Sequence, residues 1–205
     1  MTTMNIKIQN WETRLRGMIN DNVNQIALFL PDDYTFIDIG CNTGLLTQMI
    51  LDIKPNYKSI HMFEPITEYY DECVIKFDKY NNIHINNIGI GDKKESVKIK
   101  INNDNLGYNK IEADGNIDIN LITFTEYAEL NKINDVDFIK IDTEGYDIKV
   151  MKGMYQWLSK RTKLPYIYFE KGWDLYAEQK HCEHMIKQWG YKEVIEYHRD
   201  FILIP

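Results

Sequence analysis

Apolar side chains recur along the chain at two spacings, and each spacing predicts a different kind of element. Positions three to four residues apart fall on one face of a helix. Residues 10–30 follow this pattern, with Trp11, Leu15 and Ile19 on the apolar face and Pro31 directly after the helix end. The same spacing predicts further helices over residues 45–53, 67–80, 124–132, 145–158 and 176–189.

Short runs that are continuously apolar, or that alternate between apolar and polar residues, predict β-strands. They cover residues 34–39, 58–63, 84–90, 96–101, 117–121, 136–141, 165–169, 191–197 and 201–204. Residues 102–116 are polar and contain two glycines, which predicts a loop. Only a short turn at residues 198–200 separates the last two strands, so these two must pair antiparallel.

This alternation of strands and helices predicts an α/β fold in which helices cover both faces of a doubly wound, mostly parallel sheet. A sheet of this kind with an antiparallel C-terminal strand is typical of the class I methyltransferase variant of the Rossmann-like fold. No repeat, low-complexity linker or domain boundary interrupts the pattern. We therefore expect a single domain over residues 1–205, with residues 1–31 packed on it as an N-terminal helical segment.

Composition narrows the classes of function and location. The chain has 24 Lys and Arg residues against 31 Asp and Glu residues, a formal net charge of −7. An acidic chain is a poor partner for nucleic acid, because phosphates are bound by basic surfaces. No apolar run approaches the ~20 residues that a membrane span needs, and the N-terminus lacks the layout of a signal peptide. Cys41, Cys73 and Cys182 are not spaced as a zinc or disulfide framework, so we expect reduced thiols in a cytoplasmic protein.

Ligands of doubly wound sheets bind beyond the carboxyl ends of the strands. The first predicted strand ends in Asp38-Ile39-Gly40-Cys41-Asn42-Thr43-Gly44, where two glycines permit a tight turn and a close approach of a ligand. The segment is not a G-x-G-x-x-G motif, and the carboxylate of Asp38 would repel a pyrophosphate but attract a sulfonium or an ammonium group. The loop therefore favours S-adenosylmethionine over a nicotinamide dinucleotide. Its expected cofactor-binding residues are Asp38, Gly40, Cys41, Asn42, Thr43 and Gly44.

Glu64 ends the second predicted strand, 24 residues after Gly40, and Pro65 follows it. At this distance from a glycine-rich loop, an acidic side chain accepts hydrogen bonds from the ribose hydroxyls of a bound nucleoside. Glu64 and Pro65 are therefore expected at the cofactor. An alternative is that Glu64 is only a helix-start carboxylate, favoured by the helix dipole and followed by proline in the first turn.

Four short motifs follow one another in the chain: FIDIGCNTG at residues 36–44, MFEP at 62–65, GIGD at 89–92 and VDFIKIDTEG at 136–145. Together they resemble the FkbM-type S-adenosylmethionine-dependent methyltransferases over about residues 34–170, with Cys41 at a position where that family commonly has alanine. The resemblance implies O-methylation of a hydroxyl on a sugar, a glycan or another small molecule. It also implies that Ile90, Gly91 and Asp92 border the adenine, and that the cofactor is bound by Asp38, Gly40, Asn42, Gly44 and Glu64.

Transfer of a methyl group to a hydroxyl requires a base that removes the hydroxyl proton. The strand ends supply Asp142, Glu144 and Glu170 as candidates, and Lys140 is a further candidate catalytic residue nearby. Asp142 is the first choice for orienting the acceptor or acting as the base and Glu170 the second, and Asp142 is also expected at the cofactor. Lys140 shares a strand face with Asp142, and because a buried lysine needs a partner we expect it to pair with Glu144 or Glu170. The other interpretation is that a Lys140–Glu144 ion pair supports the fold without a chemical role.

Further features of the sequence raise the question of a bound metal ion and of acceptor recognition. Carboxylates at neighbouring strand ends could bind magnesium, but no dedicated ligand set appears, so a metal is not favoured. The segment His181-Cys182-Glu183-His184 fits a solvated helix face better than a zinc site, because further ligands are not evident. Residues 102–116 and the aromatic segment Trp173-Asp174-Leu175-Tyr176 are expected to recognise the acceptor.

Three other functions remain open alternatives at this point. A nicotinamide-dependent oxidoreductase shares the fold class, but the loop lacks its glycine motif. A non-catalytic module could keep the cofactor fold for binding alone, because a fold does not prove turnover. An RNA-end methyltransferase would share the cofactor and differ in its acceptor, at odds with the acidic composition.

Overall fold

The computed structural model of the chain describes residues 3–102, 108–170, 186–197 and 200–205. The helices are α1 (Thr3–Phe29), α2 (Leu45–Ile53), α3 (Thr67–Phe77), α4 (Phe124–Leu130) and α5 (Asp147–Leu158). The strands are β1 (Tyr34–Ile39), β2 (Tyr57–Phe63), β3 (Ile83–Asn86), β4 (Gly89–Gly91), β5 (Glu95–Lys100), β6 (Lys110–Ile111), β7 (Ile117–Thr123), β8 (Phe138–Ile141), β9 (Tyr166–Glu170), β10 (Glu193–Tyr197) and β11 (Asp200–Ile204).

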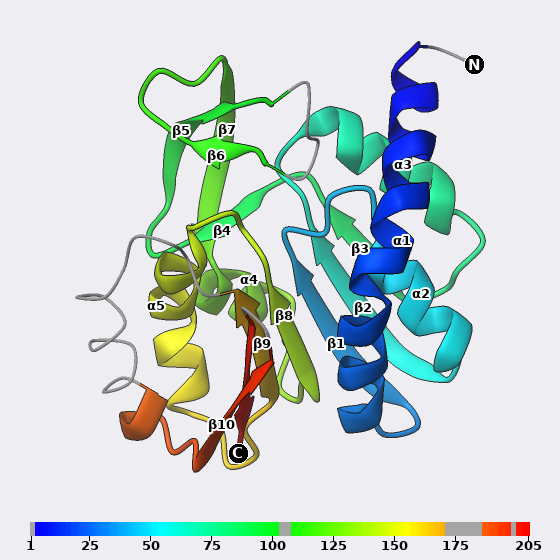
Figure 1. The fold of residues 1–205 in the computed structure, drawn as a ribbon. Coiled ribbons are helices and arrows are strands. Elements are labelled where there is room, and N and C mark those ends of the chain that lie inside the picture. The colour runs from blue at the N-terminus through cyan, green and yellow to red at the C-terminus, as the bar shows by residue number, and fades with distance from the viewer. Residues whose placement is uncertain (1–2, 103–107, 171–185, 198–199) are drawn as a thin grey trace.

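The strands form a main sheet of seven strands in the order β10-β11-β9-β8-β1-β2-β3 (Figure 1). All neighbours from β9 to β3 pair parallel, whereas β11 runs antiparallel to both β9 and β10. The predicted sheet, mostly parallel with an antiparallel C-terminal strand, is therefore confirmed. Because β1 has β2 on one side and β8 on the other, the strand order reverses at β1, which makes it the topological switch point.

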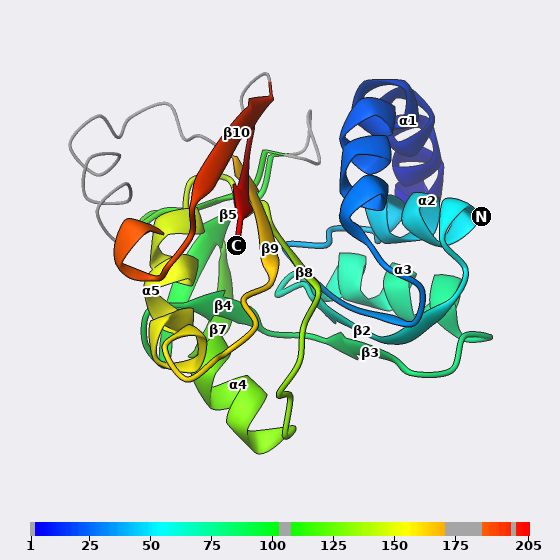
Figure 2. The same cartoon turned by 90° about the horizontal axis from the view of Figure 1, so that it is seen from below.

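Helices cover both faces of the main sheet (Figure 2). Helices α1, α2 and α3 pack on one face, where Phe36 of β1 and Phe138 of β8 are buried. Helices α4 and α5 pack on the other face, where Ile37 and Ile139 are buried. Strands β1 and β8 are buried at every residue, which explains why their sequences are mostly apolar on both faces rather than alternating, apart from Thr35, Asp38 and Lys140.

The predicted strand over residues 84–90 is wrong as a single element, because the structure divides it into β3 and β4. The amide of Asn86 donates to the carbonyl of Met62, and the amide of Asn87 donates to the carbonyls of Glu64 and Pro65. These side-chain bonds fasten the chain beside the end of β2 instead of extending the strand. Residues 89–91 then pair parallel with β7 in a second sheet.

This second sheet has four strands in the order β4-β7-β5-β6. The alternating strand predicted over residues 96–101 is present as β5, while the predicted loop over 102–116 contains the short strand β6. The apolar face of the second sheet packs on the start of α3 through a buried cluster formed by Ile66, Tyr69, Ile99, Ile119 and Leu121. The sheet therefore lies beyond the carboxyl ends of β1 and β2.

Several predicted boundaries also differ from the structure. Helix α1 begins at Thr3 rather than near residue 10, since no proline or glycine interrupts residues 3–9. Of the helix predicted over 176–189, the structure describes only the end, where residues 186–188 are helical. The segments 173–176 and 181–184 lie outside the described residues. None of the helices in the described ranges combines the length and apolar character needed to cross a membrane.

Candidate active site

A cavity of about 200 Å³ lies at the carboxyl ends of β1, β2 and β8 and extends toward the second sheet. This is the position at which doubly wound sheets bind their ligands. The strand ends bring together most of the residues that the sequence selects. Those that line the cavity are Gly40, Cys41, Asn42, Thr43, Glu64, Pro65, Ile90, Lys140, Asp142 and Glu144.

The loop after β1 turns sharply at two glycines with left-handed backbone. Gly40 has a φ of 74°, and a Cβ there would lie 2.0 Å from the carbonyl oxygen of Asp142. Gly44 has a φ of 72°, and a Cβ there would lie 2.6 Å from the ring of Phe77. The glycines therefore make room for β8 and α3, whereas the sequence suggested room for a ligand. The N–H groups of Gly40 and Cys41 both donate to the carbonyl of Phe63 at 3.0 Å, which fixes the loop beside β2.

Glu64 presents a buried carboxylate to the cavity, with the residue only 5% exposed. Its Oε2 accepts the N–H of Asn42 at 2.9 Å, and its Oε1 accepts the N–H of Ile66 at 2.9 Å. Burial raises the pKa of this carboxyl to about 7, although the two N–H groups and Lys140 act in the opposite direction. Each oxygen keeps a further lone pair for a ligand. The bond to Ile66, which precedes α3, means that the helix-start interpretation holds as well.

Asp38 pairs with Lys140 beneath the loop instead of lining the cavity. Its side chain is fully buried, with Oδ1 at 3.1 Å from the Lys140 ammonium and Oδ2 accepting the Thr47 hydroxyl at 2.6 Å. Lys140 also donates to the carbonyl of Gly40 at 2.7 Å and lies 3.6 Å from Asp142. Burial alone would lower the pKa of Lys140, but the carboxylates of Asp38 and Asp142 outweigh burial and raise it.

The expectation that Lys140 pairs with Glu144 or Glu170 is therefore wrong. The reason is strand register, because Asp38 of β1 and Lys140 of β8 are direct neighbours in the parallel pairing. Side chains at matching positions of adjacent strands point to the same face and meet. The ion pair ties the switch-point strands together and holds the first glycine of the loop.

Glu144 stands on a strained turn that follows β8 and lines the cavity. Its φ is 54° and that of Gly145 is 98°, so two consecutive residues have left-handed backbone, a conformation that is uncommon for glutamate. Burial raises the pKa of Glu144 to about 8, and the nearby carboxylates of Asp142, Glu170 and Asp147 add to the shift. A carboxyl group with this pKa can accept a proton near neutral pH.

Asp147, at the start of α5, is a further acidic group that the sequence did not single out as functional. It is buried, its Oδ2 accepts the Thr143 hydroxyl at 2.9 Å, and burial raises its pKa to about 6. Asp142 is more accessible, with a side chain that is 42% exposed. Glu170 ends β9 close enough to Glu144 to affect its pKa, but it is not part of the cavity lining.

The predicted adenine-bordering residues separate in the structure. Ile90 lines the cavity and is 2% exposed. Gly91 packs closely on α5, since a Cβ on Gly153 would lie 1.9 Å from the Gly91 carbonyl oxygen. Asp92 is exposed and borders a different surface hollow that includes Thr125 and Lys152. The structure thus places only Ile90 of these three residues in the cavity.

Comparison with known sequences identifies the family of this site. The profile of the Methyltransferase FkbM domain matches residues 38–193, which include every strand end that borders the cavity. The chain belongs to the FkbM methyltransferase family. Comparison with curated proteins gives no match.

Solved structures place the FkbM-family chain among class I methyltransferase folds. Methyltransferase FkbM from Methylobacillus flagellatus KT has a TM-score of 0.61 at 14% identity, over 84% of this chain and 44% of that chain. An rRNA methylase from Streptococcus thermophilus has a TM-score of 0.53 at 10% identity, over 90% of this chain and 93% of that one. M. capricolum TrmK, solved with S-adenosyl-homocysteine, has a TM-score of 0.50 at 12% identity, over 89% of this chain and 66% of that chain. Identities this low show the fold alone. The chain spans less than half of the Methylobacillus protein.

In this FkbM-family methyltransferase, sequence reasoning missed the contribution of α1 to the cavity. Trp11, Leu15 and Ile19 line it, and their spacing showed an apolar face but not what the face covers. Cys41 and Cys73 are buried and free, with sulfur atoms 3.9 Å apart. Within residues 3–102, 108–170, 186–197 and 200–205, no group of three or more His, Cys, Asp or Glu side chains is arranged to hold a metal ion.

Proposed function

We propose that this FkbM-family protein uses S-adenosylmethionine to methylate a hydroxyl group of a sugar, a glycan or another small molecule. The proposal rests on one observation: carboxylates line the same cavity at two separate places. Glu64 lies beyond β2, next to the glycine loop, and Asp142 and Glu144 lie beyond β8. The first suits the nucleoside of the cofactor, and the others suit a reaction in which a proton must leave the acceptor.

The residues of the cavity fit S-adenosylmethionine in charge and polarity. Glu64 offers lone pairs to the ribose hydroxyls, while Pro65 and Ile90 offer apolar walls to the adenine. Because Asp38 is fully buried, Asp142 is the better placed carboxylate for the ammonium group of the cofactor. When bound, the cofactor supplies an electrophilic methyl group on a sulfonium.

Glu144 is the carboxylate that we assign as the base. It borders the cavity on a turn held in an uncommon conformation, and its raised pKa suits removal of a proton from a hydroxyl near neutral pH. We assign Lys140 a positioning role, because its ammonium group is already paired with Asp38 and bonded to the carbonyl of Gly40. Asp142 and Glu170 are the alternative bases.

The same carboxylates disfavour an RNA end as the acceptor. Asp142, Glu144 and Asp147 gather near the β8 end of the cavity, and the chain carries a net charge of −7. The negative potential of such a cluster repels phosphates and admits neutral or cationic acceptors. Neutral hydroxyl compounds are therefore the first acceptors to test.

Replacing Glu64 by alanine tests the cofactor assignment. We expect S-adenosylhomocysteine to bind about 5- to 150-fold more weakly, equivalent to ~1–3 kcal/mol, because buried polar partners lose their acceptor. Isothermal titration calorimetry measures the change, with Glu68→Ala as the matched control, since Glu68 is an exposed glutamate in the first turn of α3. Equal affinities for the two variants, or tighter binding of NAD than of S-adenosylhomocysteine by the wild type, would contradict the assignment.

The pKa of Glu64 also predicts how cofactor affinity depends on pH. Ribose hydroxyls donate more strongly to an ionised carboxylate than to a neutral carboxyl group. With a pKa of about 7, Glu64 is ionised in about one tenth of molecules at pH 6 and about nine tenths at pH 8. We expect S-adenosylhomocysteine to bind about tenfold more tightly at pH 8 than at pH 6. The difference should vanish in Glu64→Gln, and its persistence there would assign it to another group.

A further inference from the structure

Helix α1 borders the cofactor cavity although it lies outside residues 38–193, the part of the chain that the FkbM domain matches. Trp11, Leu15 and Ile19 recur every four residues on one face of α1 and line the cavity. Trp11 also packs against the apolar cluster that joins the second sheet to Ile66 and Tyr69. One wall of the cavity therefore comes from an N-terminal element that precedes the matched domain.

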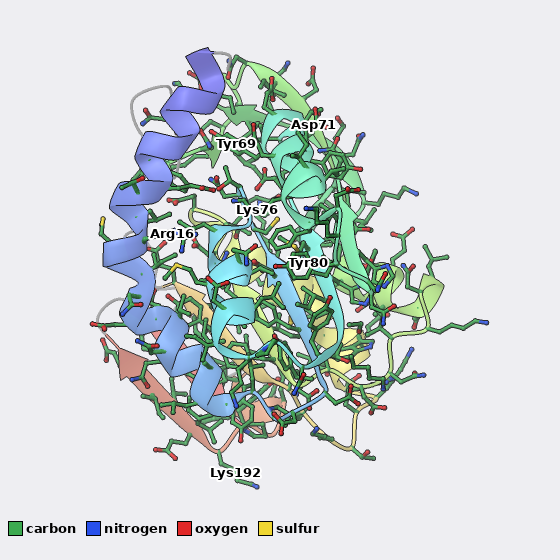
Figure 3. The ribbon with its side chains drawn as sticks, turned by 90° about the vertical axis from the view of Figure 1, so that its right-hand side faces the viewer. Arg16, Tyr69, Asp71, Lys76, Tyr80 and Lys192 are labelled. Carbon is green, nitrogen blue, oxygen red and sulfur yellow. The ribbon has the colours of Figure 1, made fainter. Side chains whose placement is uncertain are left out.

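Glu12, the neighbour of Trp11, connects α1 to both the glycine loop and α3. Its Oε1 accepts a hydrogen bond from the Thr43 hydroxyl at 2.6 Å and another from the Lys76 ammonium at 2.5 Å. Lys76 also donates to the backbone carbonyl of Thr43 at 2.7 Å. Figure 3 shows Lys76 lying between α3 and α1. Helices α1 and α3 are therefore both bonded to Thr43 of the glycine loop.

The connection continues from Thr43 to the carboxylate that we assign to the ribose. The N–H of Thr43 donates to Oδ1 of Asn42 at 2.8 Å, and the N–H of Asn42 donates to Oε2 of Glu64 at 2.9 Å. Asn42 has a left-handed φ of 50°, a conformation that asparagine adopts more readily than most non-glycine residues. Glu12 is thus linked to Glu64 through two residues of the loop.

The surroundings of Glu12 distinguish this network from an ordinary surface ion pair. Ion pairs between exposed side chains contribute little, because water and salt screen them. The side chains of Glu12 and Lys76 are only 18% and 22% exposed, and both also bond to the loop itself. Loss of the Glu12 carboxylate would leave the Thr43 hydroxyl without this acceptor in a partly buried place.

We propose that α1 completes the cofactor site and that Glu12 is a positioning residue within it. Glu12 holds Thr43 against α3, so that Asn42 keeps the conformation in which its N–H orients Glu64. This role rests on the proposed S-adenosylmethionine site. Because Val23 and Ile26 anchor α1 in the core, Glu12 affects affinity for the cofactor more than it affects the stability of the fold.

A double-mutant cycle on Glu12 and Thr43 tests the role, with S-adenosylhomocysteine as the titrated probe. We expect Glu12→Ala and Thr43→Val each to weaken binding about three- to tenfold, because each removes the same hydrogen bond. The double variant should bind no more weakly than the weaker of the two, since the losses are not independent. Asp21→Ala, which alters an exposed acidic residue of α1, should bind like the wild type.

The outcomes separate this role from a structural one and from the proposed function. The thermal midpoint of Glu12→Ala should fall by no more than roughly a few degrees, so a larger fall with unchanged affinity would overturn the positioning role. Affinity losses that multiply in the double variant would overturn it as well. Failure of the wild type to bind S-adenosylhomocysteine would overturn the proposed function itself. If the wild type binds S-adenosylhomocysteine and the affinity of Glu12→Ala stays within twofold of it, only the role of Glu12 would be overturned.

Discussion

Replacing Glu144 by glutamine is expected to lower kcat for methyl transfer by about 100-fold or more, the contribution of a general base. Glutamine has the same shape and cannot accept the proton of the hydroxyl. The left-handed turn at Glu144 and Gly145 should therefore survive while the chemistry is lost. Affinity for S-adenosylhomocysteine should stay within about twofold of wild type, because Glu64 and the glycine loop are unchanged.

The pH dependence of the reaction adds a second readout for Glu144. The ionised carboxylate is the active form of a base, and burial together with neighbouring carboxylates raises its pKa to about 8. The rate of the wild type should therefore increase as the pH rises toward 8, and Glu144→Gln should lack this increase. Glu129→Gln serves as the matched control, since Glu129 is an exposed glutamate of α4. A nearly normal kcat in Glu144→Gln would contradict this assignment. A large loss of kcat in Asp142→Asn or in Glu170→Gln would then identify Asp142 or Glu170 as the base.

Replacing Lys140 by methionine is expected to reduce the free energy of unfolding by about 3–5 kcal/mol. The lysine is 3% exposed and Asp38 is fully buried, so the variant leaves a carboxylate in the core without its cation. The carbonyl of Gly40 also loses its donor, which loosens the start of the loop. Chemical denaturation monitored by circular dichroism measures the change.

Two further variants show whether this loss comes from an unpaired buried charge. Asp38→Asn combined with Lys140→Met removes both charges and should recover most of the stability. Lys163→Met breaks a comparable pair with Asp137, but Lys163 is 67% exposed, so its loss should stay below about 1 kcal/mol. Equal destabilisation by Lys140→Met and Lys163→Met would contradict the account of the switch-point ion pair.

The main sheet and its ligand-binding edge could be predicted from the sequence because both leave local signals. Strands β1 and β8 are buried on both faces, so most of their residues are apolar on either face. The last two apolar runs are separated by too few residues for a crossover, so the sequence required them to pair antiparallel, as β10 and β11 do. The glycine loop and Glu64 follow directly after strands, and strand ends on one edge of a parallel sheet meet in one place.

The partner of Lys140 could not be predicted in this way, because it depends on register between strands that are distant in sequence. A lysine in a buried strand signals that a partner exists but does not identify it. Glu144 and Glu170 were the expected partners, whereas the parallel pairing of β1 with β8 sets Asp38 beside Lys140. Asp38 was expected at the cofactor because its carboxylate precedes the glycine loop, whereas its side chain lies below the loop.

The second sheet and the role of α1 likewise depend on contacts that no local pattern encodes. The break between β3 and β4 comes from amide side chains of Asn86 and Asn87 that bond to the end of β2. The apolar spacing of α1 predicted a buried face, but a buried face can cover a sheet, a helix or a cavity. The structure shows that part of it covers the cavity, through Trp11, Leu15 and Ile19.

The central claim, methyl transfer from S-adenosylmethionine to a hydroxyl, is tested most directly by an acceptor screen with methyl-labelled cofactor. The screen offers the wild type neutral monosaccharides and simple glycosides, with an RNA oligonucleotide as the competing acceptor, and locates the label by mass spectrometry. The account predicts label on a hydroxyl oxygen of a neutral acceptor and none on RNA. Label on RNA alone, or no transfer to any acceptor by a protein that binds S-adenosylhomocysteine, would contradict it.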